Sequence, residues 1–228
     1  MRGNEFIKRV QKYAKTHGLV CDWHPERGKG SHGSLILGDR FTVVRNPKDE
    51  LKTGTLHAML KQLNLKLSDL IEVIAMSKHS AVTVARRITS FSYPAKFTAD
   101  EDGGYVVTFR DVPEAITQGD TIEECREQAG GALQAAIETY IERRMAIPAP
   151  SEKKRGEHMI TLATRTALKA AVHLGMIERH MTNVALARIM HVNEKEVRRM
   201  LDPNHPTKAD TLEQALAALG KKVEIRVH

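Results

Sequence analysis

Apolar residues in the N-terminal part of the chain predict a helix, three short strands and a second helix. The first helix follows a candidate cap at Asn4, and its helically spaced apolar residues are Phe6, Ile7, Val10 and Ala14. Residues 19–23, 35–37 and 41–44 predict strands, and Gly38-Asp39 between the last two is typical of a hairpin turn. The second helix is predicted after Thr53 by Leu56, Met59, Leu60 and Leu63.

The middle of the chain predicts three more strands followed by a long helix. The strands are expected at 93–97, 105–109 and 115–118, with Asp102-Gly103-Gly104 as a turn. Residues 120–123 have a capping-box pattern that predicts the start of the helix. Its helically spaced residues are Ile122, Cys125, Ala129, Leu133, Ala136 and Tyr140, and Pro148 and Pro150 predict its end.

The C-terminal part is predicted to be mostly helical. One helix starts near Leu168, and others are expected at 184–190, 194–201 and 210–220. Alternating Val223, Ile225 and Val227 predict a terminal strand. Residues 76–91 lack strong periodicity and are the candidate linker. We therefore divide the chain into four segments: 1–75, 76–91, 92–151 and 152–228.

Composition and charge narrow the class of protein. The 228 residues are 41% hydrophobic and 28% charged, which is ordinary for a globular protein, and no apolar run approaches the ~20 residues of a membrane span. Residues 1–90 contain 16 Lys and Arg against 8 Asp and Glu, a net +8; residues 91–150 have a net −6 and residues 151–228 a net +5. Basic ends favour nucleic acid as a partner, and an acidic middle suits the covering of a basic neighbour.

A glycine-rich stretch before the second predicted strand is the first candidate for chemistry. It reads Gly28-Lys29-Gly30-Ser31-His32-Gly33. Glycines permit a close approach of the backbone, while Lys29 and Arg27 would attract phosphate. A histidine can act as a general base near neutral pH, and such a base beside an RNA 2′-hydroxyl can drive attack on the adjacent phosphate without a metal. The same residues also fit a plain surface loop.

Residues 1–75 resemble the HicA family of small toxins. The resemblance rests on the first helix, on Lys29-Gly30-Ser31-His32 and on the stretches 49–56 and 60–65. It implies a double-stranded-RNA-binding-like α-β-β-β-α fold and mRNA interferase activity. It also implies that His32 is catalytic and that Gly30 and Ser31 hold it. Many relatives have a second polar residue or histidine after this position, whereas here Gly33 follows. The general acid is unassigned, with Lys29 or a nearby histidine as candidates.

Residues 92–151 resemble the partner antitoxin family, HicB. The matching stretches are 93–97, 102–109, 111–115 and 117–121, the acidic helix and 147–151. The resemblance implies a partial ribonuclease-H-like fold that binds the toxin without catalysis. Acidic residues in the same segment also allow a metal-dependent nuclease: Asp100, Glu101, Asp102, Asp111 and Asp120.

Residues 185–202 resemble the helix-turn-helix tail of some HicB antitoxins, with 205–208 and 215–222 continuing the match. In that motif the second helix enters the major groove of DNA. The resemblance makes four residues candidates for base contacts: Asn193, Glu194, Lys195 and Arg198. It makes Arg199 and Lys208 candidates for phosphate contacts. Reading two half-sites requires a homodimer or a higher oligomer. A plain helical hairpin with a charged face is the alternative.

Together the resemblances predict a multidomain α+β fusion of toxin and antitoxin, natural or engineered. The predicted function is a metal-independent mRNA endoribonuclease, neutralised in cis by an antitoxin part that also binds operator DNA and represses its own operon. The alternative is a transcriptional repressor whose toxin-like part is catalytically inactive and only binds RNA. We expect no cofactor, and we expect a cytoplasmic protein. The tether would give the inhibitor an effective concentration on the order of millimolar.

Overall fold

The structure is a computed structural model that describes residues 1–27, 32–70 and 90–224. The chain divides into two compact units. The first contains Met1–Ala136 and Pro148–Thr161, and the second contains Ile137–Ile147 and Leu162–His228. The fold class is mixed α+β, as predicted. The described residues form two sheets and seven α-helices.

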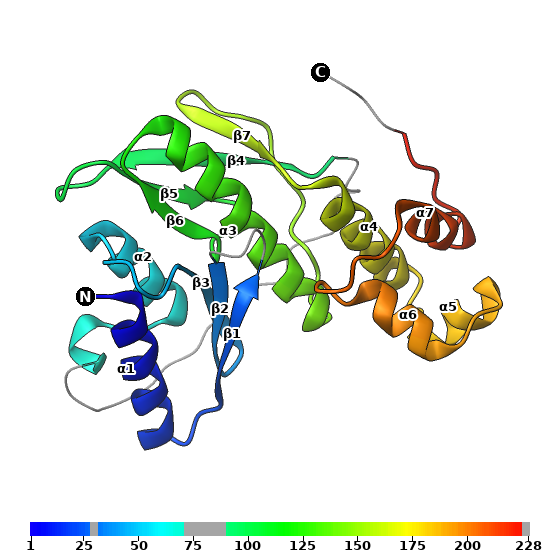
Figure 1. The fold of residues 1–228 in the computed structure, drawn as a ribbon, viewed down its shortest axis with the longest axis horizontal. Coiled ribbons are helices and arrows are strands. Elements are labelled where there is room, and N and C mark those ends of the chain that lie inside the picture. Colours follow the sequence, from blue (N-terminus) through cyan, green and yellow to red (C-terminus); the bar gives the residue numbers. More distant parts are fainter. Residues whose placement is uncertain (28–31, 71–89, 225–228) are drawn as a thin grey trace. The chain divides into compact units, whose positions relative to one another are not determined.

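The first sheet and its helices occupy the N-terminal segment (residues 1–70 as described) of the first unit (Figure 1). The elements are α1 (Gly3–Thr16), β1 (Cys21–Arg27), β2 (His32–Leu37), β3 (Arg40–Arg45), α2 (Thr53–Leu63) and the 3-10 helix η1 (Leu67–Leu70). The strands are antiparallel in the order β1-β2-β3, and the two helices pack on the sheet. The predicted apolar residues of both helices are buried in one core. The α-β-β-β-α order and the hairpin are therefore confirmed.

The second sheet occupies the middle segment (residues 90–161), also in the first unit. Its strands are β4 (Ser92–Ala99), β5 (Tyr105–Phe109), β6 (Ile116–Gly119) and β7 (Glu157–Thr161). The strand order is β6-β5-β4-β7, with every neighbouring pair antiparallel. The helix α3 (Ile122–Glu142) follows β6, and its first part contributes fully buried residues over this sheet (Figure 1): Cys125, Ala129, Ala132, Leu133 and Ala136.

The two sheets meet edge to edge inside the first unit. Strand β3 lies beside β6, and the Val43 N–H donates to the Glu114 carbonyl at 3.1 Å. The side chain of Ile116 on β6 joins the core of the N-terminal segment. The first two segments thus share a packed contact, through which the candidate site is built.

The second unit contains the end of α3 and four further helices, which share a separate apolar core. They are α4 (Thr164–Glu178), α5 (Asn183–Met190), α6 (Glu194–Leu201) and α7 (Ala209–Ala218). His191 ends α5 in the left-handed conformation, and Asn193 caps α6, so a short turn joins the two helices. No helix in the described ranges combines the length and the apolar composition needed to cross a membrane.

The structure corrects several local predictions. Arg2, not Asn4, is the N-cap of α1, and β1 begins at Cys21 rather than residue 19. The capping contacts of α3 lie one position later than expected: Thr121 Oγ1 accepts from the Glu124 N–H, and the Glu124 carboxylate accepts from the Asp120 N–H.

Two further corrections concern the C-terminal segment. Strand β7 was not predicted, and it adds residues 157–161 to the second sheet, beyond the predicted boundary at 151. The predicted terminal strand is absent from residues 221–224, and residues 225–228 lie outside the described part of the chain. The predicted linker 76–91 also lies almost wholly outside it.

Candidate active site and its cover

His32 is the first residue of β2, the central strand of the first sheet. Its backbone pairs with Arg27 on β1 and with Arg45 on β3. Pairing on both sides fixes the backbone from which the imidazole projects. Only 2% of the residue is exposed. This burial is the main feature of the candidate site.

The cover over His32 comes from the middle segment. His32 Nε2 lies 3.3 Å from Thr117 Oγ1 on β6. On α3, a Cβ atom added to Gly131 would lie 2.8 Å from His32 Nδ1 and 2.9 Å from Cε1. Real Cβ atoms do not approach other atoms this closely, so only glycine allows the helix to pass over the ring. The imidazole is thus enclosed by its own sheet on one side and by β6 and α3 on the other.

This enclosure also sets the protonation state of His32. Burial, followed by the nearby positive charge of Arg45, lowers the pKa of His32 to about 4. An imidazole with so low a pKa is neutral at pH 7 and keeps a lone pair that can accept a proton. The ring is therefore in the form that a general base requires, but in this closed arrangement no substrate can reach it.

The neighbours of His32 in the sequence are only partly described. Lys29, Gly30 and Ser31 lie outside the described residues, as does the side chain of Arg27. Gly33 has a clear steric role, because a Cβ there would lie 2.2 Å from the Trp23 ring on β1. The indole occupies the space that a larger residue after His32 would need.

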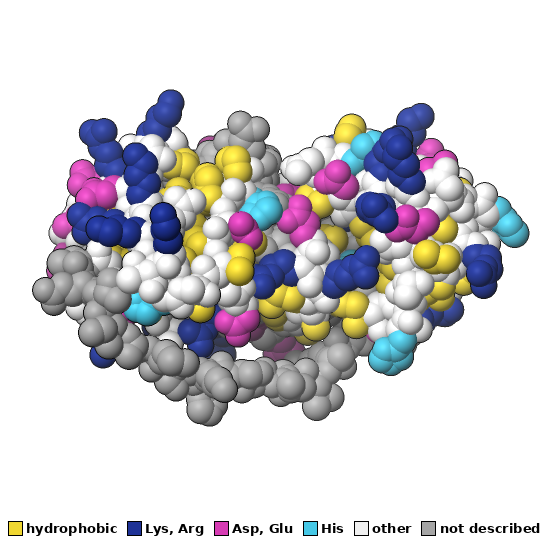
Figure 2. Space-filling model, turned by 90° about the horizontal axis from the view of Figure 1, so that it is seen from below, with side chains coloured by type: hydrophobic (Ala, Val, Ile, Leu, Met, Phe, Trp, Pro, Cys, Tyr) yellow, Lys and Arg dark blue, Asp and Glu magenta, His cyan; other side chains and the backbone are white. Residues whose placement is uncertain are grey.

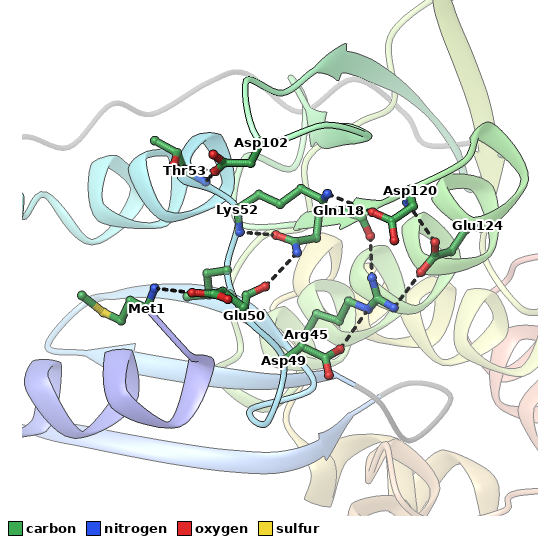
Figure 3. A pocket seen from close by; sticks show the side chains of 11 residues that line it. Met1, Arg45, Asp49, Glu50, Lys52, Thr53, Asp102, Gln118, Asp120 and Glu124 are labelled. Carbon is green, nitrogen blue, oxygen red and sulfur yellow. Dashed lines mark hydrogen bonds and ion pairs between the residues drawn. The ribbon is translucent and has the colours of Figure 1, made fainter.

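A polar pocket of about 760 Å³ lies at the same contact (Figure 3). Arg45 projects into it: Nη2 bonds to Glu124 Oε1 at 2.8 Å, and Nη1 donates to the Gln118 carbonyl at 2.9 Å. Lys52 Nζ lies 2.9 Å from Asp120 Oδ1 and donates to the Gly103 carbonyl at 2.7 Å. Sequence reasoning missed Arg45 and Lys52, because a basic residue at a strand end or before a helix has no distinctive pattern.

The start of α2 receives two further carboxylates from the middle segment. Asp102 Oδ2 accepts from the Thr53 hydroxyl at 2.6 Å and from the Thr53 N–H at 3.0 Å. Asp100 Oδ2 accepts from the Gly54 N–H at 2.9 Å. Hydrogen bonds from Thr53 lower the pKa of Asp102, and the Lys52 ammonium lowers the pKa of Asp120. These carboxylates therefore remain ionised at neutral pH.

The structure does not gather the acidic residues into a metal centre. Asp100, Asp102 and Asp120 are engaged by the N-terminal segment, while Asp111 accepts from the Ser151 N–H and hydroxyl at 2.8 Å. Glu101 is exposed in the turn. Within the described ranges, no group of three or more His, Cys, Asp and Glu residues could hold a metal ion.

The DNA-contact candidates lie on or near α6 in the second unit. Asn193 caps α6: Oδ1 accepts from the Glu196 N–H and Nδ2 donates to Glu196 Oε1, both at 2.9 Å. Glu194 accepts from Arg198, whose side chain is 72% exposed. Lys195, Arg198 and Arg199 line one pocket of about 740 Å³. Lys208 is the exposed N-cap of α7 and is not among the residues that line this pocket.

Comparison with known proteins finds two families in different parts of the chain. Residues 7–65 match the family model described as HicA toxin of bacterial toxin–antitoxin systems, and residues 92–171 match that of the HicB-like antitoxin. The chain is 41% identical over 133 residues to antitoxin HicB 2 of Photorhabdus laumondii, covering 58% of this chain and 94% of that protein. It is 35% identical over 133 residues to antitoxin HicB of Escherichia coli K12, covering 58% and 96%.

These findings define the chain first as a component of a bacterial toxin–antitoxin system. More specifically, it belongs to the HicB antitoxin family and carries a HicA toxin domain in the same polypeptide. The predicted toxin–antitoxin fusion is confirmed.

Proposed function

We propose that the chain is a self-neutralised ribonuclease toxin. The HicA part, with a double-stranded-RNA-binding-like fold, would be a metal-independent mRNA endoribonuclease with His32 as its general base. The HicB part, a partial ribonuclease-H-like fold, neutralises it in cis. The observation that carries the proposal is the burial of a neutral His32 beneath Thr117 and Gly131 of the antitoxin part.

The proposed reaction needs no cofactor. Once uncovered, His32 takes the proton from an RNA 2′-hydroxyl, and the resulting oxygen attacks the adjacent phosphorus. A 2′,3′-cyclic phosphate forms as the bond to the 5′-oxygen breaks, and that oxygen leaves with a proton from a general acid. Lys29, outside the described residues, is a candidate for this acid.

The toxin activity is tested with residues 1–75 incubated with a messenger RNA in EDTA, beside the full chain and a His32→Ala fragment. We expect cleavage by the fragment only, with His32→Ala slower by roughly 100-fold or more. Trp23 fluorescence verifies that the fragments are folded. We expect them to fold because all the buried core residues of this domain except Ile116 lie between residues 6 and 70. A folded but inactive fragment would favour the alternative, a repressor with an inactive toxin-like part. Cleavage that requires Mg²⁺ would contradict the histidine mechanism.

We further propose that the second unit is a helix-turn-helix domain that binds operator DNA as a homodimer and represses its own operon. The support is the α5–turn–α6 arrangement and the exposed basic residues of α6. In the cap, the Asn193 amide donates one hydrogen bond and accepts one, so a base contact by this residue would use its second N–H or second lone pair. Glu194, Lys195 and Arg198 are the other candidates for base contacts, and Arg199 and Lys208 are the candidates for phosphate contacts.

The operator proposal predicts that Arg198→Ala weakens binding to DNA from upstream of the gene by about tenfold, since a lost base contact costs roughly 1–3 kcal/mol. Fluorescence anisotropy with labelled DNA measures the change. Arg165→Ala, an exposed arginine at the start of α4, is the matched control and should leave affinity unchanged. Equal losses in both variants would indicate only non-specific charge effects. Neither variant should raise RNA cleavage.

A further inference from the structure

The antitoxin carboxylates occupy three neighbouring anion-binding positions on the toxin domain. Glu124 binds the Arg45 guanidinium, Asp120 binds the Lys52 ammonium, and Asp100 and Asp102 bind the N-terminal N–H groups of α2. Every one of these toxin groups is a donor or cation, and the antitoxin carboxylates that occupy them lie 46 to 79 residues away in the chain. Arg45 has one further, longer contact within the toxin domain, from Nε to Asp49 Oδ2 at 3.8 Å.

The toxin groups that bind these carboxylates are also suited to bind phosphate. Arginine and lysine are the usual phosphate ligands in proteins, and the N–H groups at a helix start bind anions. Lys52 is the N-cap of the 11-residue helix α2 and provides no side-chain cap, so the first N–H groups are available to an external anion. Gly54 leaves room for that anion, since a Cβ there would lie 2.4 Å from Asp100 Oδ2.

One of these positions, that of Arg45, is also close to the candidate base. Arg45 is paired with His32 across β2 and β3, and the Arg45 charge contributes to the lowered pKa of His32. An extended RNA strand with its reactive 2′-hydroxyl at His32 would therefore place neighbouring phosphates along Arg45 and Lys52 toward the start of α2.

On the face of the molecule drawn in Figure 2, Lys and Arg side chains lie among Asp and Glu side chains rather than in one continuous basic patch.

We propose that Arg45, Lys52 and the Thr53–Gly54 N–H groups are the RNA phosphate-binding track of the toxin, and that Asp100, Asp102, Asp120 and Glu124 of the antitoxin occupy it as phosphate mimics. The proposal deepens the proposed ribonuclease function and rests on it. Antitoxin and RNA then compete for the same donors, so neutralisation blocks substrate binding as well as covering His32.

The test uses the full chain carrying His32→Ala, so that RNA is bound but not cleaved. The four carboxylates are changed to amides: Asp100→Asn, Asp102→Asn, Asp120→Asn and Glu124→Gln. A short fluorescein-labelled single-stranded RNA is titrated by anisotropy at several salt concentrations. We expect binding to tighten by roughly tenfold or more, because the phosphate ligands are freed. Adding Arg45→Gln and Lys52→Gln should remove this gain in affinity. It should also make the slope of log affinity against log salt concentration shallower by about one to two.

The matched control removes the same amount of charge from exposed acidic residues for which no ion pair is described: Glu101→Gln, Glu123→Gln, Glu127→Gln and Glu152→Gln. It should leave RNA affinity nearly unchanged. An equal gain in the control would overturn the proposal in favour of net charge. A gain that survives Arg45→Gln and Lys52→Gln, or no gain in a folded amide variant, would also overturn it. Failure of the ribonuclease proposal is recognised separately, as RNA binding without cleavage when His32 is present.

Discussion

Replacing Gly131 with leucine in the full chain is expected to switch on RNA cleavage. The ring of His32 lies 2.8 Å from the position of the added Cβ, and both partners are held by regular structure, α3 on one side and β2 on the other. The antitoxin part must therefore move away from the toxin domain. We expect cleavage of a messenger RNA to rise by roughly tenfold or more, since uncovering restores general base catalysis.

Two companion variants make this expectation specific. Gly130→Ala is the matched control, because a Cβ at Gly130 meets nothing within 4 Å, and alanine in a helix is favoured over glycine by about 1 kcal/mol. We expect the Gly130→Ala chain not to cleave RNA and to be slightly more stable than the unaltered chain. Gly131→Leu combined with His32→Ala should also be silent, since it lacks both the base and the clashing ring. A folded Gly131→Leu chain as inactive as the Gly130→Ala control would contradict the proposed cover.

Lys169→Met is expected to destabilise the second unit by roughly 3 kcal/mol, because buried carbonyls lose a charged donor. Lys169 is 2% exposed, and its ammonium donates to the carbonyls of Asp202 at 2.5 Å and His205 at 2.7 Å. Burial lowers the pKa of Lys169, against the opposing effect of Glu138 and Asp202. Lys169 on α4 thereby binds the loop that follows α6. Because α6 carries the candidate DNA contacts, we expect the variant to weaken operator binding as well.

Urea unfolding followed by two signals measures this effect. Trp23, the single tryptophan, lies in the first unit and should report an unchanged transition, whereas far-UV circular dichroism of the helices should report an earlier one. Lys222→Met, an exposed lysine in the same unit, is the control and should alter neither signal. A wild-type-like dichroism transition for Lys169→Met would show that the contacts with the Asp202 and His205 carbonyls contribute little to stability.

Much of the secondary structure follows from local sequence. The apolar spacing of α1 and α2, the Gly38-Asp39 turn and the Asn193 cap of α6 each act within a few residues, so pattern alone locates them. Strand β7 has no such signal, because Ile160 is its only buried residue. It exists as a strand because it pairs with the edge of β4, whose paired residues lie 61 to 69 positions earlier in the chain.

The same distinction applies to the candidate site. The sequence by itself determined the two families and singled out His32, since the motif before β2 and the family stretches are contiguous in the chain. Only the tertiary structure decided that His32 is covered, that Gly131 is the glycine over its ring, and that Arg45 and Lys52 bind antitoxin carboxylates. Those contacts join residues far apart in the chain through the packing of β3 against β6, and no local pattern encodes such a pairing.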